Sequence, residues 1–442
     1  MPVAEIEDKI VSLHAQQIID CKCRPAIEIE VRTESGAIGL GAAPTGTSVG
    51  MHEAFVLRDG NPASYKGLSV HKAVEKALEI IRPALIGMNV FDQRAIDEKM
   101  IALDGTVDKH ALGGNTIYSA SIAVFRAAAA SRGMPLYRHI AGGDLKTVPV
   151  PCFNVINGGR YENLVQPFNE FLIVPYGTDS IDTAIEMAVS IFHKIADVLT
   201  DYLGHKPQVA SSYGYAAPSD DPAIVLSLMK KAIDACGYTN RVAFALDCAS
   251  SEMYDKNSNT YLLKGDRVSA DELIAYVQDL TEIFDFVFIE DLLDENDWDG
   301  YSRAVKALPR TLVLGDDLTV TSLPLLRRAH EMRAVEGFIL KPNQVGTITE
   351  AMDAYRFAAD HGMVAVPSGR SGGVVDDVVM DFSVGLQVPF QKNGAPRSGE
   401  RIEKLNFLMR ANARSSGCRL FDISPFLRFA TKSIQEDQAA SL

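Results

Sequence analysis

The chain has 442 residues, of which 47% are apolar and 23% charged, so it is long enough to bury at least one large hydrophobic core. Its formal charge of −14 at pH 7 argues against nucleic acid and anionic membrane surfaces as partners. No apolar run approaches the length of about 20 residues that spans a bilayer. An anionic ligand would therefore need a local group of cations or bound metal ions.

The six cysteines are scattered along the chain, and the first 20 residues alternate charged and apolar side chains, unlike a signal peptide. A disulfide framework is therefore not expected, and the predicted compartment is the cytoplasm. The pair Cys21 and Cys23 has no second pair downstream, which disfavours a zinc site there.

The first part of the chain predicts a small α+β unit. Residues 5–40 alternate in the manner of strands, most clearly in the run AIEIEV at 26–31. Residues 70–88 and 91–104 have helical spacing, and the alanine-rich run at 113–132 predicts a buried helix that packs closely against its neighbours. We expect this unit to cover residues 1–140.

After about residue 145, short β-branched runs alternate with amphipathic stretches, which is typical of repeated βα units. The expected strands are Val148–Val155, Phe171–Val174, Val242–Leu246, Phe286–Ile289, Leu312–Leu314, Gly337–Leu340 and Met363–Val366. The expected helices are Ile181–Leu203, Ala223–Cys236, Ala270–Phe284, Leu323–Met332 and Ile348–Asp360. This repetition favours a TIM-like barrel over 141–430, with 431–442 as a solvated tail, although an open doubly wound sheet remains possible.

Three successive apolar runs end in carboxylates. VAFALD ends at Asp247, DFVFIED at Glu290 and Asp291, and TLVLGDD at Asp316 and Asp317. In a parallel barrel these strand ends meet at one face, so the three acids would converge. Carboxylates that lie close together need a cation, and oxygen ligands suit a hard ion such as Mg²⁺. Any one of these acids could instead be a helix cap, but three in succession favour a site.

The next two strands deliver cations to the same face. Lys341 follows GFIL, and Arg370 and Ser371 follow VAVPSG. A lysine near metal ions and an apolar strand can have its pKa lowered enough to accept a proton, whereas arginine and serine suit a phosphate or carboxylate. Lys341 alone could be a surface lysine, and residues 370–373 alone could be an ordinary loop.

The chain resembles the enolase family over about residues 10–425, because a series of long segments matches the family in the same order. The segments are AAPTGTSVGMHEAFVLRDG, LDGTVDKHALGGNTIYSASIAVFRAAAASRGMPLYRHIAG, VPVPCFNVINGG, DCASSEMY, FIEDLLDENDW, GDDLTVT, LKPNQVGTITEA and ERIEKLNFLMR. The resemblance implies an N-terminal α+β capping domain followed by an enolase-type barrel. It also implies that a Lys or His base and Mg²⁺ form and stabilise an enolate next to a carboxylate.

The resemblance extends to individual residues of the metal site. Asp247, Glu290 and Asp316 match the three carboxylates that hold a conformational Mg²⁺. Ser48 matches the loop serine that helps bind a second, catalytic Mg²⁺ when the loop closes, and Thr47 beside it is an expected substrate contact.

The resemblance also implies catalytic and substrate-binding residues. Lys341 matches the general base, Lys392 the lysine near the substrate carboxylate, and Glu170 a supporting acid. Arg370 and Ser371 match the pair that binds phosphate. The ligand implied is a small phosphorylated or phosphonate-bearing carboxylate.

The chain differs from the family at the residues that help the hydroxyl group of the substrate to leave. The motif GDEGGFAP is replaced by SSYGYAAP, which puts Tyr213 in place of the catalytic glutamate. Tyr161 and Gly369 replace two histidines, and Asn169 replaces a glutamine, while Arg160 adds a cation. A phenol with a pKa near 10 is a poor acid but can donate a hydrogen bond, so Tyr213 stays a candidate catalytic residue. Asn169, Arg160 and Tyr161 are expected substrate contacts.

Three interpretations remain open. The first is an enzyme with redirected enolate chemistry on 2-phosphoglycerate, phosphoenolpyruvate or a phosphonate relative, with the carboxyphosphonoenolpyruvate synthase kind as the subtype to test first. The second is an ordinary 2-phosphoglycerate dehydratase whose acid is Glu170 or Tyr213. The third is a non-catalytic binding or structural protein with the enolase fold. The resemblance also implies a homodimer or a higher homo-oligomer.

Overall fold

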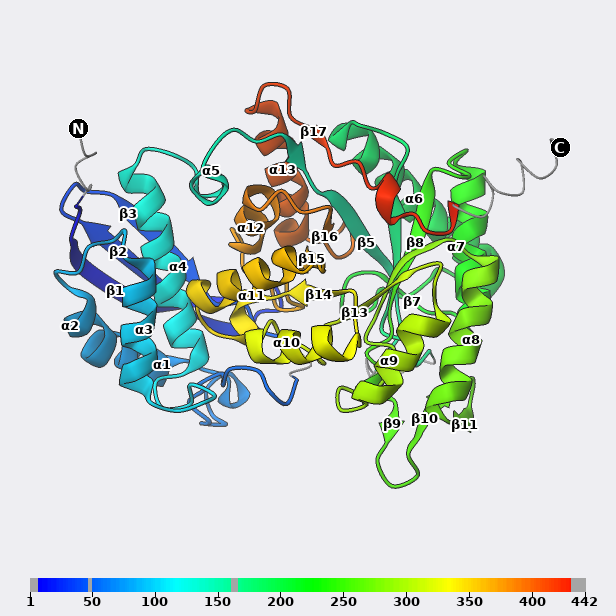
Figure 1. Ribbon diagram of the computed structural model, residues 1–442, viewed down its shortest axis with the longest axis horizontal. Helices are drawn as coiled ribbons and strands as arrows, with labels where there is room; N and C mark the ends of the chain where they lie inside the picture. The colour runs from blue at the N-terminus through cyan, green and yellow to red at the C-terminus, as the bar shows by residue number, and fades with distance from the viewer. Residues whose placement is uncertain (1–6, 47–49, 160–165, 431–442) are drawn as a thin grey trace.

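The structure, a computed structural model, describes residues 7–46, 50–159 and 166–430. Figure 1 shows a sheet with helices, in blue and cyan, beside a barrel of strands enclosed by helices, in green to red. The predicted fold class, an α+β part followed by a βα barrel, is confirmed. The expected tail at 431–442 lies outside the described residues.

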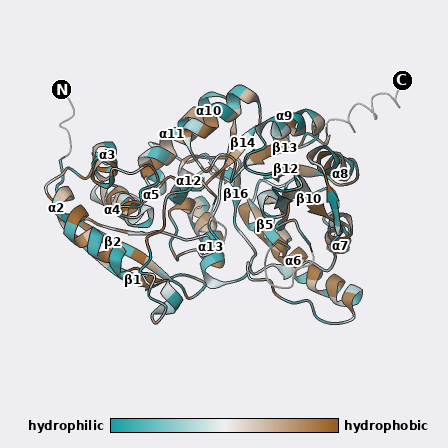
Figure 2. Ribbon diagram, turned by 90° about the horizontal axis from the view of Figure 1, so that it is seen from below, coloured by the Kyte–Doolittle hydropathy of each residue, from teal (hydrophilic) through white to brown (hydrophobic). Residues whose placement is uncertain are grey.

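The first sheet is an antiparallel meander. Its strands, in spatial order, are β1 (Ile10–Ile19), β2 (Pro25–Thr33) and β3 (Ile38–Ala42). Hydrophilic and hydrophobic residues alternate along β2, because one face of the sheet packs on helices and the other faces outward (Figure 2). A Cβ atom at Gly39 or Gly41 would lie closer than 3.0 Å to the backbone of helix α4 (Gly114–Ser131), so these two glycines let the alanine-rich helix contact β3 directly.

The remaining helices of this part are short except for α3. They are α1 (His71–Lys76), α2 (Arg82–Leu85), α3 (Gln93–Asp104) and α5 (Leu136–Ala141). A π-helical turn over Ala77–Ile81 joins α1 to α2, so the helix expected over 70–88 forms as three consecutive segments. Helix α4 is buried along most of its length, as its sequence predicts.

Eight strands form the barrel in the order β15-β14-β13-β12-β8-β6-β5-β16. They are β5 (Val150–Asn157), β6 (Glu170–Pro175), β8 (Val242–Asp247), β12 (Phe286–Glu290), β13 (Leu312–Gly315), β14 (Gly337–Leu340), β15 (Val364–Pro367) and β16 (Phe390–Lys392). A parallel bridge between Ser368 and Lys392 brings the two ends of this order together and closes the barrel.

One strand does not follow the parallel arrangement expected from the sequence. β6 pairs antiparallel with both β5 and β8, while the other neighbouring strands of the barrel are parallel. Its sequence periodicity predicts a strand correctly but carries no information on direction, which depends on the connections. Two antiparallel helices, α6 (Ile181–Leu203) and α7 (Pro222–Ala235), connect β6 to β8.

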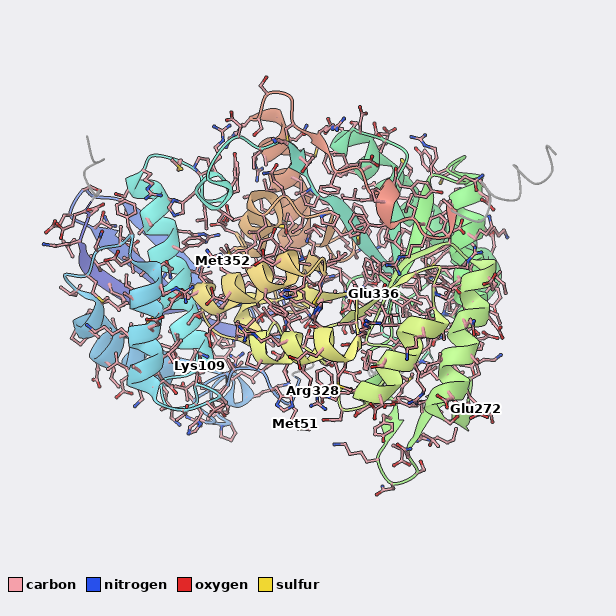
Figure 3. All side chains as sticks on the ribbon, in the orientation of Figure 1. Met51, Lys109, Glu272, Arg328, Glu336 and Met352 are labelled. Atoms are coloured by element: carbon pink, nitrogen blue, oxygen red, sulfur yellow. The ribbon has the colours of Figure 1, made fainter. Side chains whose placement is uncertain are left out.

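The other barrel helices lie outside the strands (Figure 1). They are α8 (Ala270–Ile283), α9 (Trp298–Ala307), α10 (Leu323–Met332), α11 (Ile348–Asp360), α12 (Val379–Gly385) and α13 (Gly399–Ala413). Helix α8 begins at a capping box in which Ser269 and Glu272 exchange side-chain and backbone hydrogen bonds (Figure 3 labels Glu272). Three of these helices, α9, α12 and α13, and the strand β16 were not predicted from the sequence.

Further short strands lie outside the barrel order. They are β4 (Thr147–Val148), β7 (Tyr215–Ala216), β9 (Tyr254–Asp255), β10 (Thr260–Leu263), β11 (Asp266–Val268) and β17 (Arg419–Leu420). β7 pairs with the end of β5, which brings the segment between α6 and α7 to the rim of the barrel. Within the described residues, no helix is long and apolar enough to cross a membrane.

A buried carboxylate joins the two parts of the molecule. Asp97 on α3 accepts hydrogen bonds from the backbone N–H and hydroxyl of Thr349 at 3.0 and 2.6 Å, and from the hydroxyl of Ser121 at 2.7 Å. Nearby, the buried Lys109 forms an ion pair with Glu350 at 3.0 Å (Figure 3 labels Lys109). The first turn of α11 is therefore held by side chains of the N-terminal part.

Candidate active site

Six of the ionisable residues predicted for the site lie at one end of the barrel. Asp247, Glu290 and Lys392 are the last residues of β8, β12 and β16, and Asp316 and Lys341 directly follow β13 and β14. Glu170 is the first residue of β6, and because that strand is antiparallel it lies opposite Asp247 at the same end. The reversed strand thus brings a sixth side chain to the group.

Lys392 lies in the centre of three carboxylates. Its Nζ atom is 2.6 Å from Glu290, 3.2 Å from Asp247 and 3.3 Å from Glu170. Asn169 supports the group by donating its backbone N–H to the carbonyl of Asp247 at 3.0 Å and its side-chain amide to the carboxylate at 3.4 Å. Lys392 is therefore fixed beside the carboxylates that the sequence predicts as metal ligands.

The carboxylates at this end need more positive charge than the lysines supply. Burial raises the pKa of Glu290 well above its usual value, and the neighbouring Asp247 raises it further. Burial also raises the pKa of Asp247, although Lys392 opposes this. Glu290 Oε1 is buried and has no hydrogen-bond partner among the described residues. An unpaired oxygen among oxygen ligands fits a hard cation such as Mg²⁺.

Asp316 forms a second centre with Lys341. The Lys341 ammonium group bonds to Asp316 Oδ2, and Gln344 donates to Asp316 Oδ1 at 2.8 Å. Thr321 orients both partners, because its hydroxyl donates to Gln344 at 2.8 Å and accepts the backbone N–H of Lys341 at 2.9 Å. Burial alone would raise the pKa of Asp316, but Lys341 holds it below its usual value.

The pKa of Lys341 differs from the sequence-based expectation. Burial lowers it, as expected, but the carboxylate of Asp316 outweighs burial, so the pKa is raised. The expected lowering is therefore not produced by the protein groups alone. It would require positive charge that competes for Asp316.

Asp291, the second acid at the end of the β12 run, is a structural carboxylate. It accepts the backbone N–H groups of Asp316 and Asp317 at 2.9 and 2.8 Å. Among the described residues, Asp291, Asp316 and Asp317 also form a cluster in which one carboxylate oxygen from each lies within 4.8 Å of the other two. Burial, with Asp316 nearby, raises the pKa of Asp291 to about 7. Since both Asp291 oxygens bind backbone amides, we assign it to holding the loop after β13.

The predicted phosphate-binding arginine already faces a carboxylate. Arg370 donates to Glu53 through Nη1 at 2.8 Å and through Nη2 at 3.1 Å, and both side chains are buried. Burial lowers the pKa of Arg370, but Glu53 more than compensates, so it is raised. Glu53 belongs to the loop that also contains Ser48, and the sequence analysis missed its role.

A single cavity connects these groups. Its wall contains carboxylates, lysines and arginines from the strand ends together with loop residues of the N-terminal part: Gly46, Glu53, Asn169, Glu170, Asp247, Ala249, Asp291, Asp316, Asp317, Lys341, Ser368, Gly369, Arg370, Ser371, Lys392, Asn393, Gly394, Arg401 and Lys404. The predicted base, lysine partner and phosphate-binding pair therefore face one space. Arg401 and Lys404, on α13, were not predicted.

The side chain of Tyr213 lies away from this cavity wall and contacts Cys21. Its hydroxyl donates to the backbone carbonyl of Cys21 at 2.7 Å, and the guanidinium group of Arg401 lies 5.0 Å from the centre of its ring. Burial, with Cys21 nearby, raises the pKa of the phenol. Tyr213 is not among the described residues that form the cavity wall. Four other predicted site residues, Thr47, Ser48, Arg160 and Tyr161, lie outside the described residues.

Comparisons with known proteins agree on one family. Residues 10–140 match the family model described as the enolase N-terminal domain, and residues 145–419 match the enolase C-terminal TIM barrel domain. A protein named Enolase from Methanococcus aeolicus is 40% identical over 402 residues, which cover 91% of this chain and 94% of that protein. A protein named Enolase from Methanopyrus kandleri is 39% identical over 417 residues, covering 93% and 97%.

Proposed function

Because the chain belongs to the enolase family, whose members are lyases, we propose that it removes the proton next to the carboxylate of a small phosphorylated or phosphonate-bearing acid. The observation that carries this proposal is the single cavity whose wall contains Lys341, Lys392, Glu170, Asp247 and Asp316. Glu290 is not on that wall, but it is fully buried and bonds to Lys392 at 2.6 Å. A base, a cation and anionic metal ligands around one space are what enolate formation requires.

In this proposal, Lys341 accepts the α-proton at Nζ. Lys392 neutralises the substrate carboxylate, on which negative charge increases as the enolate forms, and Glu170 supports Lys392. Asp247, Glu290 and Asp316 would hold a conformational Mg²⁺, and Ser48 would help to bind a second, catalytic ion. When bound, Mg²⁺ would supply positive charge that offsets the negative charge of these carboxylates and of the enolate.

The phosphate or phosphonate group is assigned to Arg370 and Ser371, which line the same cavity. Asn169 is a further proposed substrate contact from the cavity wall. Thr47, Arg160 and Tyr161 are proposed contacts on the basis of the sequence alone.

Water elimination is the step that this chain alters in our proposal. Tyr213 replaces the family glutamate, and its hydroxyl donates a hydrogen bond to the backbone carbonyl of Cys21. We therefore favour redirected enolate chemistry on 2-phosphoglycerate, phosphoenolpyruvate or a phosphonate relative, and carboxyphosphonoenolpyruvate synthesis is the first variant to test.

Ordinary dehydration of 2-phosphoglycerate is the second candidate, and one observation favours it. Glu170 lies on the cavity wall, 3.3 Å from Lys392, where a carboxylic acid could protonate the leaving hydroxyl. Both relatives described above are named Enolase, which also supports this candidate.

One experiment separates the candidates. The protein is incubated with Mg²⁺ and 2-phosphoglycerate in D₂O, and NMR follows exchange of the α-proton and formation of phosphoenolpyruvate. Exchange with dehydration slower by a factor of about 10² or more supports redirected chemistry. Full dehydration supports the ordinary enzyme, and neither signal, with phosphonate analogues also inert, contradicts the proposal and leaves a binding or structural role.

We also propose the domain boundaries, the cellular location and the oligomeric state. The chain divides into an N-terminal capping domain (1–140), a barrel (141–430) and a tail (431–442), which the limits of the two family models support. A cytoplasmic location and a homodimer or larger homo-oligomer are proposed from the family resemblance. Size-exclusion chromatography with light scattering tests the latter.

A further inference from the structure

Helix α13 turns charged residues toward the interior. Glu400, Arg401 and Lys404 are 4%, 5% and 4% exposed, whereas Leu405 and Leu408 continue the buried face with apolar side chains. Lysine is almost never this deeply buried unless it is paired. Here the ammonium group of Lys404 pairs with Glu400, one turn earlier on the same helix, and Lys404 lines the cavity.

The Lys404 ammonium group occupies the space next to Gly369. A Cβ atom at residue 369 would lie closer than 3.0 Å to Lys404 Nζ, a separation that real Cβ atoms do not show. The φ angle of Gly369 lies outside the left-handed range, so the backbone itself does not require glycine there. Gly369 therefore matters for the space that it leaves to Lys404.

The cavity needs this cation to bind a doubly charged anion. Both terminal nitrogens of Arg370 are bonded to Glu53, which offsets the charge of this arginine. Lys404 and Arg401 share the carboxylate of Glu400, with Arg401 Nε 3.7 Å away. The buried carboxyl of Asp377 also faces the space beside Gly369, and burial raises its pKa although Lys404 opposes this, so Lys404 Nζ is the cation closest to that space. Phosphate carries about two negative charges at pH 7, so a second cation beside Arg370 strengthens its binding.

We propose that Lys404 is a specificity-determining residue, whose ammonium group fills the space beside Gly369 and binds the phosphate or phosphonate group of the substrate together with Arg370. The inference rests on the proposed function for the identity of the ligand. Lys404 supplies from α13 the positive charge that no side chain at residue 369 provides.

The test measures binding of inorganic phosphate to the full-length protein with Mg²⁺ by isothermal titration calorimetry, so it needs no turnover. Lys404→Met keeps most of the volume but removes the charge, and we expect it to weaken phosphate binding by about 10- to 100-fold. Lys109→Met is the matched control, because Lys109 is another buried lysine paired with a carboxylate, and it is outside the cavity wall. We expect Lys109→Met to leave phosphate affinity unchanged.

A second variant tests the shared space. Gly369→Ala should displace the ammonium group and weaken phosphate binding by about 3- to 10-fold in the wild-type background, but by less than about 2-fold when Lys404 is already methionine. Additive effects, unchanged affinity in Lys404→Met, or no phosphate binding by the wild-type protein would each overturn the proposal. If phosphate binding behaves as expected while α-proton exchange is absent, the proposed reaction fails and the role of Lys404 stands.

Discussion

Arg370 and Glu53 form a buried, two-point ion pair that joins the loop after β15 to the loop after β3. Glu53 also accepts the backbone N–H of Gly50 at 3.1 Å, and so fixes the loop itself. Paired hydrogen bonds of this kind fix both partners in orientation as well as in distance. The segment from Gly50 to Glu53 is therefore tied to the proposed phosphate-binding arginine.

Replacing Glu53 by alanine should destabilise the protein by about 3–5 kcal/mol, because Arg370 would keep a buried charge without its carboxylate. Added phosphate can take the place of the lost carboxylate, so we expect phosphate to raise the Tm of this variant more than that of the wild type. Thermal unfolding with and without phosphate measures both effects. Glu295→Ala is the control, since Glu295 contacts the same loop at Met51 but not Arg370. Equal phosphate responses in both variants would contradict the coupling.

Lys341→Ala should lower the rate of α-proton exchange in D₂O by at least about 10²- to 10⁴-fold, because it removes the proposed proton acceptor. NMR of 2-phosphoglycerate in D₂O gives the rate directly. Lys306→Ala, on the exposed face of α9, should exchange at the wild-type rate. Exchange retained in Lys341→Ala would remove Lys341 as the base.

Tyr213→Phe should leave turnover within a few-fold of wild type and lower the free energy of unfolding by about 1 kcal/mol, because it removes one hydrogen bond to the carbonyl of Cys21. Glu170→Gln should slow any residual dehydration by about 10²-fold or more, since Glu170 lies on the cavity wall. Phosphoenolpyruvate formation followed by NMR compares the two variants. A large rate loss in Tyr213→Phe with unchanged stability would make the phenol the acid.

Chelation by EDTA should abolish α-proton exchange, and added Mg²⁺ should restore it. Glu290→Gln should raise the Mg²⁺ concentration needed for half-maximal exchange by at least about 10-fold, which is the smallest loss expected when a group supporting a metal site is removed. Asp285→Asn is the control, because Asp285 precedes the other end of the same strand, β12. A Mg²⁺ requirement unchanged in Glu290→Gln would contradict the ligand assignment.

The buried Asp97 should make stability depend on pH. Burial raises its pKa from 3.8 to about 6 in the folded protein, although hydrogen bonds from Thr349 and Ser121 oppose this. The folded state therefore binds this proton more tightly than the unfolded state, so the free energy of unfolding falls as the pH rises from about 4 to 6, by up to about 3 kcal/mol from this group. Urea unfolding at several pH values measures the slope. Asp97→Asn should remove this contribution, while Glu98→Gln, on the exposed side of α3, should retain it.

Much of the barrel could be predicted because most of its strands are short apolar runs, and β8 and β12 end at an ionisable residue while β13 and β14 are directly followed by one. The strand β16 could not, since Phe390–Lys392 is only three residues long and is defined by its pairing with β5. The direction of β6 was also beyond reach, because a period of two reads the same in both directions.

In the candidate site, too, some residues could be predicted from the sequence and others could not. Residues that follow strands, such as Asp316 and Lys341, were found by position along the chain. Glu53 and Lys404 were missed because their roles depend on contacts across the fold: Glu53 bonds to Arg370, which is 317 positions away. The contact that Tyr213 makes with Cys21, 192 positions away, is likewise invisible in the motif that contains it.

The reversed direction of β6 also bears on how the substrate range of this fold can diverge. Because β6 ends at the end of the barrel where β8 begins, α6 and α7 together take the chain away from that end and back to it, and the segment between them, 204–221, reaches the opposite rim through β7. This segment carries none of the proposed metal ligands or the base. Substitutions in this segment, which contains Tyr213, therefore leave those side chains unchanged. The fold thus separates the residues at the strand ends from a rim segment that can vary independently of them.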